Sequence, residues 1–149
     1  IQPVFIDLDM NTVEPAIGAQ RMDKVYAWKS MLDMGIHTSG GSDAPVVSFD
    51  AMENIYFAVT RKNISGQPQE GWIPSEKISV DEAVKLFTKN AAYASYTEDE
   101  TGTIEVGKNA DFVVLEKDIY KIDPDEIKTT KVDMTVLGGE IVYERKVEE

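Results

Sequence analysis

The spacing of apolar side chains changes once along the chain, near residue 100. Before that point apolar residues recur every three or four positions in several stretches, which is the spacing of helices with one buried face. From Gly102 onward apolar and polar residues alternate, as they do in strands. The pattern predicts an α/β chain in which a small antiparallel β unit follows a region of helices and short buried strands.

Two short apolar runs flank the first predicted helix. Residues 1–8 and 36–41 are rich in β-branched or apolar side chains and each predicts a strand. Between them, residues 21–34 have helical spacing, and Gly35 is placed to end that helix. A strand, a helix and a strand of these lengths predict a βαβ unit with two parallel strands.

Two further helices are predicted downstream. Residues 51–60 form the first, with Ser48 or Asp50 as its N-cap. Residues 79–95 form the second, which begins with the capping box Ser79-Val80-Asp81-Glu82. Both helices carry an apolar stripe that predicts a buried face.

The connection between these helices, residues 61–78, has no periodicity and contains two glycines and two prolines. A connection of this length predicts a functional loop or lid, or a disordered segment. Trp72 within it either lines a binding site or, in the interpretation we favour, attaches the loop to the body of the protein.

The last third of the chain predicts a small antiparallel unit. Gly138-Gly139 has the composition of a two-residue hairpin turn, and residues 123–127 predict a single helical turn. The four short strands predicted there are residues 103–106, 111–115, 131–137 and 141–143.

Composition narrows the classes of function. The 149 residues suffice for one ordinary domain, and the absence of cysteine excludes disulfides, thiolate metal sites and a cysteine nucleophile. A net charge of −12 repels phosphate backbones and anionic lipids, so we expect no nucleic-acid partner. No apolar run approaches the roughly 20 residues of a membrane helix, and we expect a cytoplasmic protein without a membrane partner.

The candidate chemistry centres on Asp43, which follows Gly40-Gly41-Ser42 at the end of the second predicted strand. An acid at the carboxyl end of a barrel strand is typical of a catalytic position. The single histidine, His37, lies six residues earlier, roughly 20 Å along a strand, which excludes a Ser-His-Asp relay within this chain. Asp43 is therefore either a metal ligand or general base whose partners lie elsewhere, or a residue that caps a turn or helix.

Three segments, in this order, resemble the metal-dependent amidohydrolases, especially the YtcJ-like branch, amidohydrolase family 3. They are Gly41-Ser42-Asp43-Ala44-Pro45, then Gly71-Trp72-Ile73-Pro74 followed by Glu82-Ala83, and finally the run Gly-Thr-Ile-Glu-Val-Gly-Lys-Asn-Ala-Asp-Phe-Val-Val-Leu from Gly102 to Leu115. The resemblance covers nearly the whole chain and is to the C-terminal part of the family's sequence.

The resemblance implies a TIM-type (β/α)8 barrel with an attached composite β-sandwich. Residues 1–97 would supply the last two βα units of the barrel, and residues 98–149 half of the sandwich. Asp43 would be both a catalytic residue and a metal ligand: it would contact a divalent ion, zinc in our prediction, and handle the proton of the attacking water. The family's metal-binding histidines have no counterparts in this chain and would lie upstream of Ile1, so we expect no metal bound to these residues alone.

These observations leave alternatives open. The first is a fragment of a hydrolase that acts on carbon–nitrogen bonds of non-peptide amides, inactive in isolation, with a small-molecule substrate. The second is a non-catalytic binding or regulatory module derived from the family, and the third a small enzyme of unrelated mechanism. The strand-like opening without methionine favours a fragment, whose partner would be the missing N-terminal part of the same protein. Open sheet edges also predict a homo-oligomer.

Overall fold

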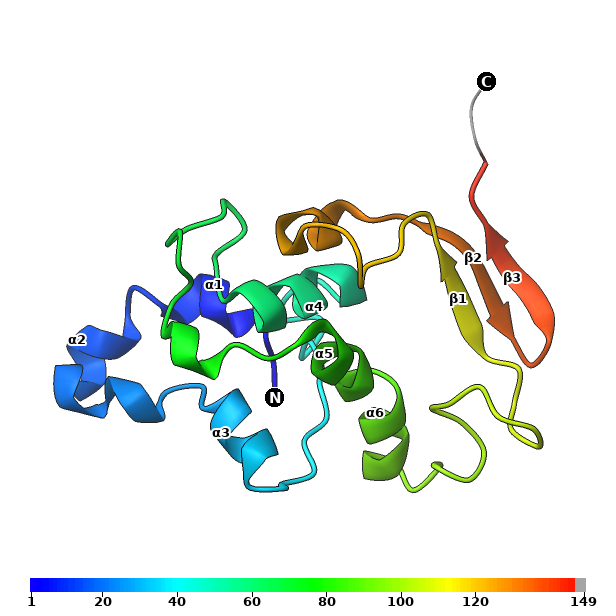
Figure 1. The fold of residues 1–149 in the computed structure, drawn as a ribbon, viewed down its shortest axis with the longest axis horizontal. Coiled ribbons are helices and arrows are strands. Elements are labelled where there is room, and N and C mark those ends of the chain that lie inside the picture. Colours follow the sequence, from blue (N-terminus) through cyan, green and yellow to red (C-terminus); the bar gives the residue numbers. More distant parts are fainter. Residues whose placement is uncertain (147–149) are drawn as a thin grey trace.

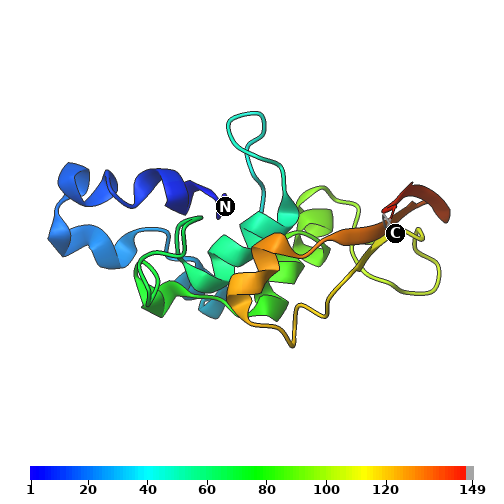
Figure 2. The ribbon, with the colours of Figure 1, turned by 90° about the horizontal axis from the view of Figure 1, so that it is seen from above.

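A computed structural model describes residues 1–146. A helical part lies beside a small three-stranded sheet, which projects from one end (Figures 1 and 2). The elements, in chain order, are α1 (Phe5–Asp9), α2 (Val13–Ile17), η1 (Ala19–Lys24), α3 (Trp28–Asp33), α4 (Ala51–Thr60), η2 (Pro74–Glu76), α5 (Val80–Leu86), α6 (Lys89–Ala94), β1 (Phe112–Leu115), η3 (Pro124–Thr129), β2 (Val132–Leu137) and β3 (Glu140–Glu144). Among residues 1–146, no helix is long and apolar enough to cross a membrane.

Helix α4 is the centre of the core. It is buried on nearly every side, because α5 packs against one face and η3 lies along another (Figure 2). Its predicted bounds are confirmed, and so is its N-cap: the Asp50 carboxylate accepts the backbone N–H groups of Met52 and Glu53. The cap and the long apolar face are local signals for this helix, and the packing of that face against α5 and η3 supplies most of its stability.

The predicted strand over residues 1–8 is wrong, because Phe5–Asp9 is the helix α1. A short apolar run has no period that separates strand from helix, and burial decides the outcome. Val4 and Ile6 are buried against the core, and the backbone N–H of Val4 donates to the Asn54 side chain at 3.2 Å. The first residues are therefore anchored to α4 and continue as the helix α1, not as an extended strand.

The predicted strand over residues 36–41 is also absent from the assigned strands of residues 1–146. One pair of backbone bonds of the expected parallel pattern is present: Ile1 N donates to Ser39 O at 2.8 Å, and Gly41 N donates to Ile1 O at 2.9 Å. The chain turns at Pro3 and Val4, so this pairing does not continue into a ladder. The predicted arrangement of the last two βα units is therefore not confirmed by the assigned elements of residues 1–146.

Two predicted helices are each divided in the structure. Residues 21–34 become η1 and α3, because Tyr26 adopts φ +47° and breaks the run. Gly35 ends α3 as predicted, in a Schellman arrangement in which Ile36 N donates to Met31 O. Residues 79–95 become α5 and α6, which are separated at Thr88 (φ −127°, ψ −98°). The predicted capping box at Ser79 and Glu82 is confirmed.

The connection from residue 61 to residue 78 is an ordered loop held by Arg61, which is fully buried. The guanidinium donates to the carbonyls of Trp72 and Tyr26, at 2.6 and 3.0 Å. It also lies 4.7 Å from the ring centre of Trp28 and 5.8 Å from that of Trp72. The interpretation of Trp72 as a residue that attaches the loop to the body is confirmed.

The C-terminal sheet has the order β1-β2-β3 and is antiparallel throughout. The predicted hairpin turn is confirmed, because Gly138 and Gly139 both have positive φ angles, and η3 confirms the predicted helical turn. The predicted strand over residues 103–106 is wrong. The Lys108 ammonium donates to Glu98 O and to the Thr103 hydroxyl, at 2.6 and 2.7 Å, and these bonds fold the segment into a loop instead.

Candidate functional site

The segment that carries Asp43 is held on two opposite edges. On one edge, Ile1 bonds to Ser39 O and Gly41 N. On the other edge, Gly40 N donates to Leu86 O at 2.9 Å, and the Asn90 side-chain amide donates to Thr38 O at 2.9 Å. In an extended chain, successive residues direct their backbone groups to alternate edges, so these four bonds describe an extended segment with a neighbour on each side.

Gly40 is the point of closest approach in this segment. A Cβ atom at Gly40 would lie 2.7 Å from Cζ of Phe87, which means that the ring rests directly on the backbone. A Cβ atom at Gly41 would meet nothing within 4 Å. The first glycine of the pair is thus required by packing, whereas the second has open space beside it.

Asp43 itself is exposed at the end of this segment. Its φ angle is +60°, a left-handed conformation that is uncommon outside glycine and in which Asp and Asn are enriched. The backbone carbonyl accepts Val46 N at 2.9 Å. The carboxylate makes no hydrogen bond or ion pair with any residue of 1–146, and it does not cap α4, whose N-cap is Asp50. The carboxylate is therefore available to a ligand.

His37 is not brought into contact with Asp43. Its exposed ring stacks on Tyr93, with ring centres 4.4 Å apart and an angle of 22° between the planes. Within residues 1–146, no group of three or more histidine, cysteine, aspartate or glutamate side chains is arranged to hold a metal ion. A catalytic metal site usually takes about three protein ligands, and the described residues bring no such group together.

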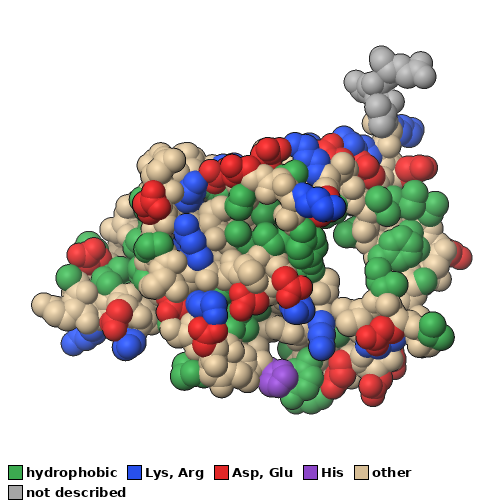
Figure 3. Space-filling view, viewed as in Figure 1, with side chains coloured by type: hydrophobic (Ala, Val, Ile, Leu, Met, Phe, Trp, Pro, Cys, Tyr) green, Lys and Arg blue, Asp and Glu red, His purple; other side chains and the backbone are tan. Residues whose placement is uncertain are grey.

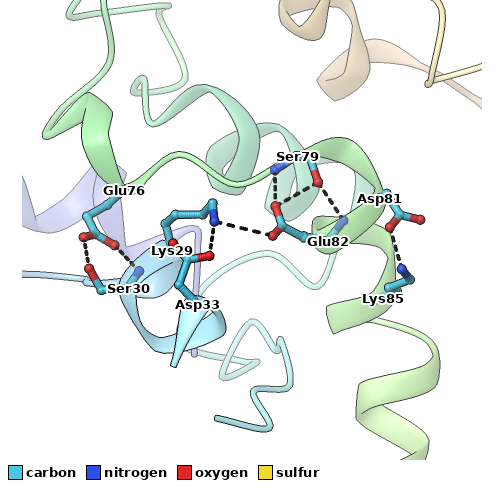
Figure 4. Close-up of polar contacts among 8 residues, drawn as sticks. All are labelled: Lys29, Ser30, Asp33, Glu76, Ser79, Asp81, Glu82 and Lys85. Atoms are coloured by element: carbon cyan, nitrogen blue, oxygen red, sulfur yellow. Dashed lines mark hydrogen bonds and ion pairs between the residues drawn. The ribbon is translucent and has the colours of Figure 1, made fainter. Parts of the chain in front are cut away.

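A second polar centre, which the sequence analysis missed, lies around Glu76 (Figure 4). Glu76 is 5% exposed, and its carboxylate accepts the backbone N–H of Ser30 at 2.9 Å and the Ser30 hydroxyl. It thereby caps α3 from 46 residues away, since the N-cap Ala27 has no side chain able to do so. Nearby, Lys29 bonds to Asp33 and lies 3.9 Å from Glu82.

The Glu76 carboxylate also influences the pKa of Arg61. Burial lowers the pKa of the Arg61 guanidinium to about 10, and the negative charge of Glu76 opposes that change. At neutral pH the guanidinium therefore stays charged, and its Nη2 atom has no hydrogen-bond partner among the described residues. The charge of Glu76 thus favours the charged form of a buried cation, and no local sequence pattern indicated that interaction.

A groove of about 840 Å³ separates the helical part from the sheet, and it is visible as an opening in Figure 3. Its walls are mainly apolar and come from α4, α5 and the sheet, including Met52, Ile55, Phe87, Phe112 and Val136. Large apolar side chains of the sheet also remain exposed, among them Val113, Leu137, Ile141, Val142 and Tyr143. A sheet with exposed apolar side chains on this scale is typical of one that packs against further chain.

The chain is similar in sequence to known amidohydrolases. A family model described as the amidohydrolase family matches residues 1–143. The putative amidohydrolase YtcJ of Bacillus subtilis is 39% identical over 145 residues, which are 97% of this chain and 27% of the relative. An N-substituted formamide deformylase of Arthrobacter pascens is 36% identical over 122 residues, 82% of this chain and 22% of the relative. The chain thus spans about a quarter of the length of these curated relatives.

The fold is also found among solved structures. An uncharacterized metal-dependent hydrolase of Pyrococcus horikoshii superposes with a TM-score of 0.72 at 23% identity, over 83% of this chain and 25% of that one. At this identity the likeness concerns the fold alone. It places the helices and the small sheet together in an arrangement that occurs within a larger protein.

Proposed function

This chain belongs to the amidohydrolase family, and on that premise we propose that it supplies one corner of the active site of a metal-dependent hydrolase. The observation that carries the proposal is the free carboxylate of Asp43, at the end of a segment fixed on both edges. A carboxylate that is exposed, unpaired and held by a rigid backbone is suited to bind a ligand or to move a proton.

We propose hydrolysis of a carbon–nitrogen bond in a small non-peptide amide as the reaction. A divalent ion, zinc in our proposal, would supply Lewis-acid activation of water and of the scissile carbonyl when bound. Asp43 would hold that ion through one carboxylate oxygen. The carboxylate would also accept a proton from the attacking water and return it to the leaving nitrogen, which is the work of a general base and then a general acid.

The remaining ligands would come from chain outside these residues. In the proposal, residues 1–97 form the last part of a (β/α)8 barrel and residues 98–149 half of a β-sandwich. Support comes from the share of the relatives that this chain spans, about a quarter, and from the large apolar side chains that the sheet leaves exposed. The missing N-terminal part of the same protein is the partner that we propose for the groove and the exposed sheet residues.

Metal content tests the proposal in two proteins. The isolated chain is expected to retain no stoichiometric zinc by elemental analysis after dialysis, because one carboxylate leaves the ion mostly hydrated. A chimera in which this chain replaces the matching part of the Arthrobacter deformylase is expected to hold zinc and to hydrolyse an N-substituted formamide. The matched 122 residues include Asp43 wherever the match begins in a chain of 149. Tight zinc binding by the isolated chain would contradict the proposal, as would a folded chimera without metal.

The isolated chain is also expected to self-associate. Strands β1 and β3 are open edges, and the apolar residues of the sheet lack a covering layer within residues 1–146. Size-exclusion chromatography with light scattering is expected to give a mass above 16.6 kDa that rises with concentration. In the chimera this association is expected to disappear, since the deformylase supplies the covering chain. A strictly monomeric profile of the isolated chain at high concentration would contradict this expectation.

A further inference from the structure

We propose that the corner between α5 and α6, formed by Leu86, Phe87 and Asn90, is the device that positions Asp43. The inference rests on the proposed function, because it concerns the placement of the same carboxylate. It assigns to Asn90 and Phe87 a positioning role, since neither side chain would touch substrate or metal.

The first step is the bonding pattern along the segment. Thr38 O and Gly40 N lie two residues apart and so face the same edge of an extended chain. Asn90 donates to the first, and Leu86 O accepts from the second, both at 2.9 Å. The α5–α6 corner therefore occupies the place that a neighbouring strand would fill. It fixes the register of the segment, because a slip by one residue would break both bonds.

The second step is the packing above the segment. The ring of Phe87 lies against the backbone at Gly40, where even a methyl group would overlap it at 2.7 Å. Thr38 is 5% exposed and Asn90 is half-buried, so the bond between them is partly shielded from water. A hydrogen bond in such a position holds its geometry more firmly than one on the surface.

The third step is the link to Asp43, three residues beyond Gly40. The Asp43 carboxylate has no bond of its own within residues 1–146, so its direction is set by the backbone that carries it. Loosening the segment at Thr38 and Gly40 would move the carboxylate without removing it. A misplacement of about 1 Å in a catalytic group costs on the order of 100-fold in rate.

Hydrogen exchange in the isolated chain tests the positioning directly. Asn90→Ala is expected to speed exchange of the Gly40 and Gly41 amides at least tenfold, while amides of α4 change less than twofold. Lys89→Ala, an exposed neighbour on α6, is the matched control and is expected to change neither. Gly40→Ala is expected to speed amide exchange in the same segment, because the new methyl group displaces the Phe87 ring. Gly41→Ala has open space beside it and is expected to leave amide exchange at α5 unchanged.

Steady-state kinetics of the deformylase chimera test whether loosening the Asp43 segment lowers the catalytic rate. Asn90→Ala is expected to lower kcat by about 10–100-fold, with KM and zinc content within twofold of the parent chimera. An equal rise in exchange over the whole chain would reduce Asn90 to a general stabilising residue and overturn the inference. An unchanged kcat beside faster exchange at Gly40 would also overturn it. If Asp43→Asn leaves kcat intact, the proposed function fails instead, and the exchange data still decide whether the corner holds the segment.

Discussion

Replacing Asp43 by asparagine in the deformylase chimera is expected to lower kcat by about 10²–10⁴-fold, the range contributed by a positioned general base. The substitution keeps the size of the side chain and a group that tolerates a left-handed backbone, so the φ of +60° remains accessible. It removes the negative charge that would bind the metal and accept a proton. The loss is therefore expected in kcat first, with the fold unchanged.

The matched control is Ser42→Ala, which changes the neighbouring residue without altering charge. The Ser42 hydroxyl makes no hydrogen bond within residues 1–146, and we expect this variant to keep kcat within threefold of the parent. Initial rates over a range of N-substituted formamide concentrations, with zinc content measured on the same samples, separate the two effects. An Asp43→Asn chimera that retains kcat within tenfold would mean that Asp43 is only a turn residue.

The second large effect is expected at Glu76. Glu76→Ala is expected to lower the free energy of unfolding of this chain by about 1–3 kcal/mol, the cost of leaving a buried hydrogen-bond donor without its acceptor. Two losses combine: α3 loses the acceptor for Ser30 N, and the buried Arg61 guanidinium loses its compensating charge. Urea unfolding followed by circular dichroism gives the change in free energy.

A matched control and a double variant make this test specific. Glu70→Ala removes an exposed glutamate from the same loop and is expected to change stability by less than about 0.5 kcal/mol. Arg61→Met combined with Glu76→Gln removes both charges, and its cost is expected to be smaller than the sum of the single substitutions. Additive costs would show that the two residues act independently, contrary to the structure.

The elements that could be predicted from sequence are those fixed by local signals. Helix α4 follows from its apolar spacing and the Asp50 cap, and the start of α5 from its capping box. The β2–β3 hairpin follows from Gly138-Gly139. Each of these signals acts within four residues, and nothing in the tertiary structure opposes it.

The errors arose where distant residues decide the local conformation. The helix expected over residues 21–34 breaks at Tyr26, whose carbonyl is taken by Arg61 and whose ring packs between Trp28 and Trp72. Residues 5–9 form the helix α1 because the burial of this segment is set by α4. No local window of sequence contains Tyr26 together with Arg61 or Trp72, or the first residues of the chain together with α4.

In the candidate site, too, local signals could be predicted from the sequence and contacts between distant residues could not. Asp43 could be found from the two glycines and the acid that follow an apolar run, a pattern with a local meaning. Its segment is held by the side chain of Asn90 and the carbonyl of Leu86, which lie 52 and 46 residues along the chain from the groups they bond. Asn90 sits within an ordinary helical pattern, and no sequence signal marked it as a contact of the Asp43 segment.

The central claim is that Asp43 is one ligand of a metal site completed by chain outside these residues. The most direct measurement is the crystal structure of the zinc-loaded deformylase chimera, with the metal located by anomalous scattering at the zinc edge. We predict one Asp43 carboxylate oxygen at about 2.0–2.2 Å from the zinc ion. An active chimera whose zinc ion has no Asp43 oxygen in its coordination shell would contradict the account.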